Sequence, residues 1–133
     1  MIEVELVRII IDENKKEQVI VLKEKKGRRL LPIVIGSNEA SAIRAHLNGA
    51  IPPRPLTHDL IYSLIRVLEG TLEKIVIDKL VETTFHAKVH LRLKNGQTKI
   101  VDARPSDSVA LAVRAKSPIF LEEQVLDTLA HQA

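Results

Sequence analysis

The chain has 133 residues, a length that fits one domain with a core of its own. It contains no cysteine, so disulfides, thiolate metal sites and cysteine nucleophiles are excluded. A formal charge of +3 and a pI near 9.3 are compatible with an anionic partner but do not define a site. Only Tyr62, Phe85 and Phe120 are aromatic, which removes the usual stacking platform for single-stranded nucleic acid.

The N-terminal sequence does not resemble a secretory signal. It alternates apolar and polar residues and carries early acids, whereas a signal peptide has a basic segment followed by an apolar one. No apolar run approaches the roughly 18 residues that cross a bilayer. The sequence therefore predicts a cytoplasmic protein that does not bind membranes.

Three strands are predicted at the start of the chain. Residues 2–11 alternate in polarity, residues 17–23 form the returning strand of a hairpin, and the segment 12–16 is the polar turn between them. The apolar segment 30–35 is a third strand, in which Pro32 indicates a sheet edge or the start of a strand. Because these strands are close in sequence, we expect antiparallel pairing.

Two helices are predicted next. In the first, over residues 37–48, Ser37 is the expected N-cap and Gly49 follows the C-terminus. Prolines keep the following segment extended, and Thr57 is expected to begin the second helix. That helix ends before Gly70 and carries an apolar stripe of Leu60, Ile61, Leu64, Val67 and Leu68.

The remaining elements are two strand pairs and two helices. Residues 72–81 form a strand, and residues 84–93 give the cleanest alternation in the chain. Asn95-Gly96 is a strong hairpin signal that leads into a returning strand. Helices are expected over residues 106–115 and 122–130, with a short strand between them. Clustered hairpins and helices favour an α+β fold over a parallel doubly wound sheet.

The stretch PRPLTHD at residues 53–59 has two interpretations. In the structural one, Thr57 caps the helix, Asp59 complements its dipole and Arg54 pairs with a carboxylate. His58 has no such role, and a helix N-terminus disfavours its charged form. A neutral imidazole at this position could ligate a metal ion or act as a base.

The stretch DARPSD at residues 102–107 is similar. Ser106 is a good N-cap and Asp107 is a favoured acid for the first turn of a helix. Asp102 ends the preceding strand, where it can form an internal ion pair with Arg104 or belong to a polar site.

Together the two stretches contain the residue types of a phosphodiesterase site. Carboxylates suit Mg²⁺ or Mn²⁺, which combine one or two of them with waters and substrate phosphates. Arginine suits phosphate oxygens, and histidine transfers protons. This hypothesis requires the two stretches to lie close together in space. The predicted metal ligands are Glu39, Asp59, Asp102 and Asp107, the predicted catalytic residues are His58, Asp102 and Asp107, and the predicted phosphate-binding residues are Arg54 and Arg104.

A second basic feature is the face of the strand at 84–93 that carries His86, Lys88, His90 and Arg92. The two histidines lie about 13 Å apart on an extended strand, so they do not share one metal ion. This face could contact a phosphate backbone, although the solvated side of an amphipathic strand is the simpler interpretation. The basic turn KEKKGRR at 23–29 is interpreted as a flexible loop.

Several stretches resemble, in order, the bifunctional nuclease domain family: LPIVIGSNEASAI, RPLTHDL, FHAKVHLRL, VDARPSDSVALAVR and SPIFLEEQVL. The resemblance implies a single compact domain over residues 1–133, with an open, barrel-like and largely antiparallel sheet, packed helices and a homo-oligomeric assembly. Some plant relatives are described as having both DNase and RNase activity. The matching positions are Pro32, Gly36, Glu39, Arg54, Pro55, Thr57, His58, Asp59, Asp102, Arg104, Pro105, Ser106 and Asp107.

The leading hypothesis is a nuclease that is assisted by Mg²⁺ or Mn²⁺ and cleaves DNA and RNA with low sequence preference. A homo-oligomer is expected, with a dimer favoured. The alternative is a non-catalytic oligomeric module that binds nucleic acid or a small anionic ligand through the same arginines. Salt-sensitive binding without cleavage or metal dependence would distinguish the alternative.

Overall fold

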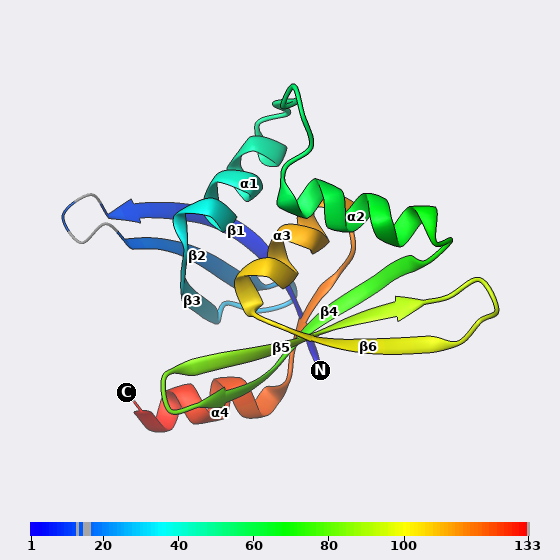
Figure 1. Cartoon of the computed structure of the whole chain (residues 1–133). Coiled ribbons are helices and arrows are strands. Elements are labelled where there is room, and N and C mark those ends of the chain that lie inside the picture. Colours follow the sequence, from blue (N-terminus) through cyan, green and yellow to red (C-terminus); the bar gives the residue numbers. More distant parts are fainter. Residues whose placement is uncertain (13, 15–16, 133) are drawn as a thin grey trace.

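Figure 1 shows the computed structural model of the chain, which describes residues 1–12, 14 and 17–132. The strands are β1 (Ile2–Asp12), β2 (Glu17–Glu24), β3 (Leu30–Ile35), β4 (Thr71–Val81), β5 (Thr84–Arg92), β6 (Thr98–Ala103) and β7 (Ile119–Leu121). The helices are α1 (Ser37–Leu47), α2 (Thr57–Val67), α3 (Pro105–Ala115) and α4 (Glu123–Gln132).

The strands form one sheet of seven, in the order β3-β2-β1-β7-β4-β5-β6. All neighbours are antiparallel except β4 and β7, which run parallel. The two edge strands, β3 and β6, do not pair, so the sheet is strongly curved but not closed. This confirms the predicted α+β class, the mixed and largely antiparallel sheet, and the edge position of Pro32.

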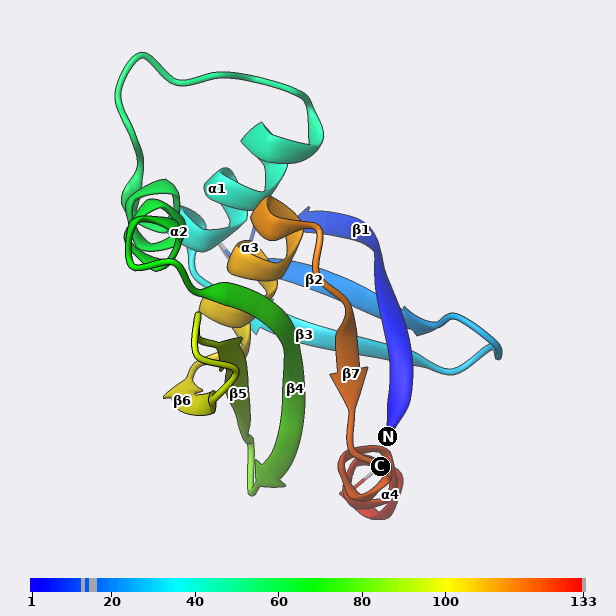
Figure 2. The same cartoon turned by 90° about the vertical axis from the view of Figure 1, so that its right-hand side faces the viewer.

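Helix α3 lies inside the curve of the sheet and is the most buried helix. It packs against α1, α2, β4 and β5, and Val109 and Ser108 on it are fully buried. Helix α4 lies apart from the other three, against β4 (Figures 1 and 2). None of the described helices is long and apolar enough to cross a membrane.

The predicted N-cap residues are wrong by one or two positions. In all three cases the predicted cap lies inside the first turn, and the residue that precedes the helix has extended backbone angles. For α2 the capping bond comes from the first-turn acid, because Asp59 Oδ2 accepts the backbone N–H of Leu56 at 3.0 Å. The observed N-caps are Gly36, Leu56 and Arg104, in place of Ser37, Thr57 and Ser106.

The apolar stripe predicted for α2 is mostly exposed. Ile61 packs against the core together with Tyr62 and Ile65, because only this side of α2 faces α3 and β4. The other four stripe residues are at least half exposed: Leu60, Leu64, Val67 and Leu68. The left-handed residue at the end of this helix is Glu69, with a φ of 63°, and not Gly70.

The alternation of β5 is confirmed. Ala87 and Val89 are buried against the helices, whereas Lys88 and His90 lie on the opposite face of the sheet and are half-buried. Gly96 adopts a φ of 86° in the predicted hairpin turn that leads to β6. The predicted turn at 12–16 lies largely outside the described residues.

Candidate active site

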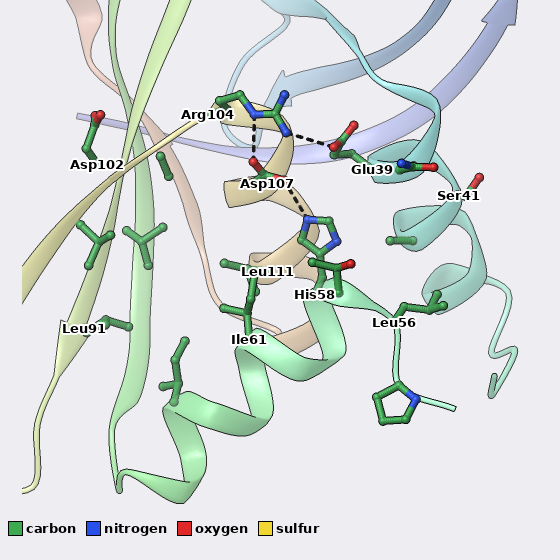
Figure 3. Close-up of a pocket in the computed structure, with 18 residues that line it drawn as sticks. Glu39, Ser41, Leu56, His58, Ile61, Leu91, Asp102, Arg104, Asp107 and Leu111 are labelled. Carbon is green, nitrogen blue, oxygen red and sulfur yellow. Dashed lines mark hydrogen bonds and ion pairs between the residues drawn. The ribbon is translucent and has the colours of Figure 1, made fainter. Parts of the chain in front are cut away.

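The two Arg-Pro stretches meet at the first turns of α2 and α3. His58 Nε2 lies 2.9 Å from Asp107 Oδ1, and both residues line the same pocket (Figure 3). The His58 side chain is only 9% exposed, because α2 packs directly on α3. The prediction that the two stretches lie close together in space is therefore confirmed.

Arg104 connects this pair to α1. Its Nε donates to Asp107 Oδ2 at 3.0 Å, and its Nη2 donates to Glu39 Oε1 at 3.1 Å. Gly36 makes room for this arrangement, since a Cβ at that position would collide with Oε2 of Glu39. The four side chains Glu39, Arg104, Asp107 and His58 form what we call the Arg104 network.

The Arg104 network has an unused donor. Arg104 is 69% exposed, and its Nη1 makes no hydrogen bond with the residues that the structure describes. A guanidinium presents its N–H groups as a planar fork that matches phosphate oxygens. The network therefore offers a hydrogen-bond donor that matches phosphate oxygens and is already held in place by two carboxylates.

The charge state of Asp107 fixes the orientation of the histidine. Burial works against the carboxylate, but hydrogen bonds from His58 and Arg104 outweigh it and lower the pKa of Asp107. Asp107 is therefore ionised at neutral pH and can only accept hydrogen bonds. It follows that Nε2 of His58 carries a hydrogen, and that Nδ1 holds the free lone pair whenever the ring is neutral.

The pocket that contains the network has a volume of about 1050 Å³ and lies between the three helices α1–α3 and the strands β5 and β6. It is charged at one end and apolar at the other (Figure 3). The charged end includes the Arg104 network and the small polar residues Asn38, Ser41 and Thr57. The apolar end is lined by Ile61, Ile65, Val89, Leu91, Val101 and Leu111.

Asp102 lies at the mouth of this pocket but outside the Arg104 network. Its side chain is 77% exposed and accepts a hydrogen bond from Lys88 Nζ at 3.0 Å. That hydrogen bond lowers the pKa of Asp102. Lys88 also lies 3.3 Å from Asp78. The predicted ion pair between Asp102 and Arg104 is therefore wrong, because Lys88 of β5 is the register partner of Asp102 on the neighbouring strand β6.

Asp59 and Arg54 also lie outside the network. Asp59 accepts a hydrogen bond from Arg114 Nε at 3.1 Å, and the Arg114 guanidinium stacks 5.0 Å from the centre of the Tyr62 ring. Arg54 is exposed and makes no ion pair with the described residues, so its predicted carboxylate partner is wrong. Neither residue lines the large pocket.

Only two of the four predicted metal ligands lie beside each other. Glu39 and Asp107 share Arg104, whereas Asp59 and Asp102 are held apart by Arg114 and Lys88. Among the described residues, no three His, Asp or Glu side chains are arranged to hold a metal ion. Glu39 and Asp107 supply two carboxylates, and Mg²⁺ commonly takes one or two from a protein and its remaining ligands from water and substrate phosphate.

The sequence analysis missed Arg114 and the apolar end of the pocket. Asp107, Leu111 and Arg114 follow a spacing of four and three residues on one face of α3, and this spacing was a usable signal. The apolar wall gave no comparable signal. Leu91 and Val101 look like ordinary strand residues until β5 and β6 are paired.

Comparison with known proteins shows which family the chain resembles. The sequence profile of the bifunctional nuclease domain matches residues 20–133, from within β2 to the last residue. The chain belongs to the bifunctional nuclease domain family. Both Arg-Pro stretches, and every member of the Arg104 network, lie inside the matched region.

Relatives of this bifunctional nuclease domain include both bacterial and plant proteins. An uncharacterised protein of Mycobacterium tuberculosis is 46% identical over 93% of the chain, which spans 73% of that protein. Bifunctional nuclease 1 of Oryza sativa subsp. indica is 24% identical over 85% of the chain, and Bifunctional nuclease 2 of subsp. japonica is 27% identical over 82%. The chain spans only 35% and 34% of these two plant proteins.

Proposed function

We propose that this chain is a nuclease that hydrolyses phosphodiester bonds in DNA and RNA with low sequence preference. The observation that carries the proposal is the Arg104 network at the charged end of a large open pocket. Membership of the bifunctional nuclease domain family supports the reaction class, as do the names of the plant relatives.

Arg104 is the phosphate-binding residue in this proposal. In the proposal, its free Nη1 group donates to a non-bridging phosphate oxygen. The guanidinium, which two carboxylates hold in place, stabilises the charge that develops on that oxygen during hydrolysis. Glu39 and Asp107 fix the guanidinium plane, so little side-chain freedom is lost when the phosphate binds. Arg54, the other predicted phosphate ligand, does not line the pocket and is not part of this clamp in the proposal.

His58 is the proton-transfer residue, and Asp107 is its positioning residue. The hydrogen bond from Nε2 to Asp107 fixes the ring and leaves Nδ1 to accept a proton. A buried histidine oriented by a carboxylate is a common arrangement for a general base. Asp102, which the sequence analysis included among the catalytic residues, remains a prediction without support from this network.

A divalent ion is also part of the proposal. Glu39 and Asp107 would hold Mg²⁺ or Mn²⁺, with water and substrate phosphate as the other ligands. Such an ion polarises a phosphoryl oxygen and lowers the pKa of a bound water. An ionised carboxylate has about four lone-pair sites, so Glu39 and Asp107 could hold the ion while they still accept hydrogen bonds from Arg104.

The test is cleavage of plasmid DNA and of a single-stranded RNA by the purified protein with Mg²⁺, Mn²⁺ or EDTA. We expect His58→Gln to slow cleavage by about 100-fold or more. The matched control is His86→Gln, which changes a half-buried histidine on the other face of the sheet and should alter the rate by less than about twofold. Equal rates for a folded His58→Gln variant and the parent would remove His58 from the mechanism.

The metal is tested separately by calorimetric titration of Mn²⁺ into the parent and the Glu39→Gln variant. We expect the parent to bind the ion and the variant to bind it at least about tenfold more weakly. If Mn²⁺ does not bind and EDTA leaves cleavage unchanged, the metal part of the proposal fails, whereas the nuclease part stands.

One observation favours the alternative of a non-catalytic binding module. Each of the four predicted acids already has a basic partner, which is the arrangement expected of structural ion pairs. In that case the protein binds nucleic acid or a small anion in a strongly salt-dependent way and does not cleave. The assay above decides between the two, because only the nuclease shows turnover that depends on His58.

Two further expectations remain proposals. A homo-oligomer, with a dimer favoured, is supported by the exposed apolar residues of α2, and light scattering of the purified protein tests it. A cytoplasmic location is a prediction from the sequence alone.

A further inference from the structure

The apolar end of the large pocket is not explained by a site that binds only phosphate. Its wall is formed by aliphatic side chains of β5, β6, α2 and α3, and no Phe, Tyr or Trp lines the pocket. Val101 on β6 is 47% exposed although it faces the pocket. An open apolar surface of this kind, adjacent to a charged cluster, indicates a ligand with an apolar part next to an anionic part.

A base-paired duplex does not present such a surface to the wall. Its exterior consists of hydrated phosphates and sugars, and its base faces are stacked inside. Placing hydrated phosphate against Leu91 and Val101 would remove water without supplying hydrogen bonds, which is unfavourable. An unpaired nucleotide differs, because its base exposes an apolar face a few ångströms from its phosphate.

We propose that the apolar end of the pocket binds an unpaired base while Arg104 binds the adjacent phosphate, so that the substrate is single-stranded nucleic acid. This inference rests on the proposed nuclease function and adds the substrate class to it. The base lies against aliphatic side chains such as Ile65, Leu91 and Val101, which replace the missing aromatic platform. DNA and RNA share this chemistry.

The composition of the wall also determines base preference. The six wall residues carry no side-chain hydrogen-bond donor or acceptor, so the wall cannot read the edge of a base. Binding therefore discriminates little among the four bases. The pocket volume of about 1050 Å³ is slightly above the roughly 300–1,000 Å³ of small-ligand sites, which leaves room for more than one nucleotide.

Edge strand β6 supplies a matched pair of variants. Val101 pairs with Val89 of β5 and faces the pocket, whereas its neighbour Ile100 pairs with His90 and faces the opposite side of the sheet. The two side chains are similarly exposed, at 47% and 58%, so polar substitutions at either position should leave the fold intact. Val101→Asp and Ile100→Asp add the same charge to the two faces of one strand.

The experiment measures binding and cleavage of a fluorescent 12-nucleotide single strand and of a blunt duplex with the same sequence. Binding is measured in EDTA and cleavage in Mn²⁺. We expect the single strand to bind and to be cleaved at least about tenfold better than the duplex. Val101→Asp should weaken single-strand binding about tenfold or more, and Ile100→Asp by less than about twofold. Val101→Asn, which adds no charge, should weaken binding in the same direction.

The outcomes separate this inference from the proposed function. Cleavage of both substrates at equal rates, or equal binding by the two aspartate variants, overturns the single-strand inference and leaves the nuclease intact. Single-strand binding that depends on Val101, without any cleavage, supports the ligand class and overturns the nuclease. Thermal melting of each variant confirms that it is folded.

Discussion

Two clusters in this molecule share one plan: a single basic side chain bridges two carboxylates. Arg104 joins Glu39 to Asp107 between α1 and α3, and Lys88 joins Asp78 to Asp102 across β4, β5 and β6. The Arg104 network lines the pocket and contacts a buried histidine, whereas Lys88 lies on the opposite face of the sheet.

The comparison shows how position decides the role of similar ion pairs. Arg104 lines the pocket and its Nη1 group has no hydrogen-bond partner among the described residues, which leaves one donor available to a ligand. The carboxylates around Lys88 sit on a sheet surface, where the lysine mainly offsets the charge of the partly buried Asp78. The following predictions test this difference, from the largest expected effect to the smallest.

Arg104→Ala and Lys88→Ala should separate activity from stability. We expect Arg104→Ala to reduce nuclease activity by about 100-fold or more, because the phosphate contact is lost. Lys88→Ala should keep activity within about twofold but lower the melting temperature, because Asp78 is left without its cation. Both are measured by a cleavage assay and thermal denaturation of the same preparations. Equal losses of activity would mean that the Lys88 cluster belongs to the site.

Asp107→Asn and Asp102→Asn should differ in their effect on stability and on its pH dependence. At pH 7 we expect Asp107→Asn to lower the free energy of unfolding by about 1–3 kcal/mol, because His58 and Arg104 lose a charged acceptor. Asp102 is mostly exposed, so its variant should change the free energy little.

The pH dependence follows from the pKa of each carboxyl, which is lowered in the folded protein. Such a group stabilises the fold above its ordinary pKa of 3.8, and the contribution is lost as pH falls through the folded pKa. Urea unfolding between pH 7 and pH 3 should therefore show that the parent protein loses stability below about pH 4. Asp107→Asn should reduce this loss more than Asp102→Asn does. A steeper loss in Asp107→Asn than in the parent would contradict the assigned direction.

Arg114→Met is expected to have a small effect on stability and almost none on activity. This change removes the ion pair with Asp59 and the contact with Tyr62, which together should be worth about 0.5–1 kcal/mol at this partly exposed position. Nuclease activity should stay within about twofold, because Asp59 lies outside the Arg104 network. Activity as low as that of Arg104→Ala would restore Asp59 to the site, where the sequence analysis placed it.

Local patterns in the sequence were sufficient for the elements of the fold. The alternation of β5 and the Asn95-Gly96 turn correspond to a strand and a hairpin in the structure, because both signals depend only on neighbouring residues. The caps were less accurate. In the sequence, a serine or threonine near a helix start can be either the N-cap or a residue of the first turn. The structure distinguishes the two in α2, where Asp59 and not Thr57 accepts the hydrogen bond of the cap.

The site was predicted in part for a similar reason. His58 was singled out because helix capping did not explain it, and it lies in one pocket with Arg104, a predicted phosphate-binding residue. Partners across the fold were not predictable, since Lys88 meets Asp102 only through strand register and Arg114 meets Asp59 only through helix packing. The same limit hid Leu91 and Val101 as parts of a ligand wall.

Strand β7 has a consequence for how the molecule is synthesised and folds. It has only three residues, yet it joins β1 to β4 and is the sole link between the two halves of the described sheet. These residues, Ile119–Leu121, leave the ribosome after all the other strands. The hairpins can form earlier, but the halves that carry Glu39 and His58 are joined within one sheet only once β7 has emerged. A nascent chain of this protein can therefore join the two halves of its sheet only after residue 121 has been made.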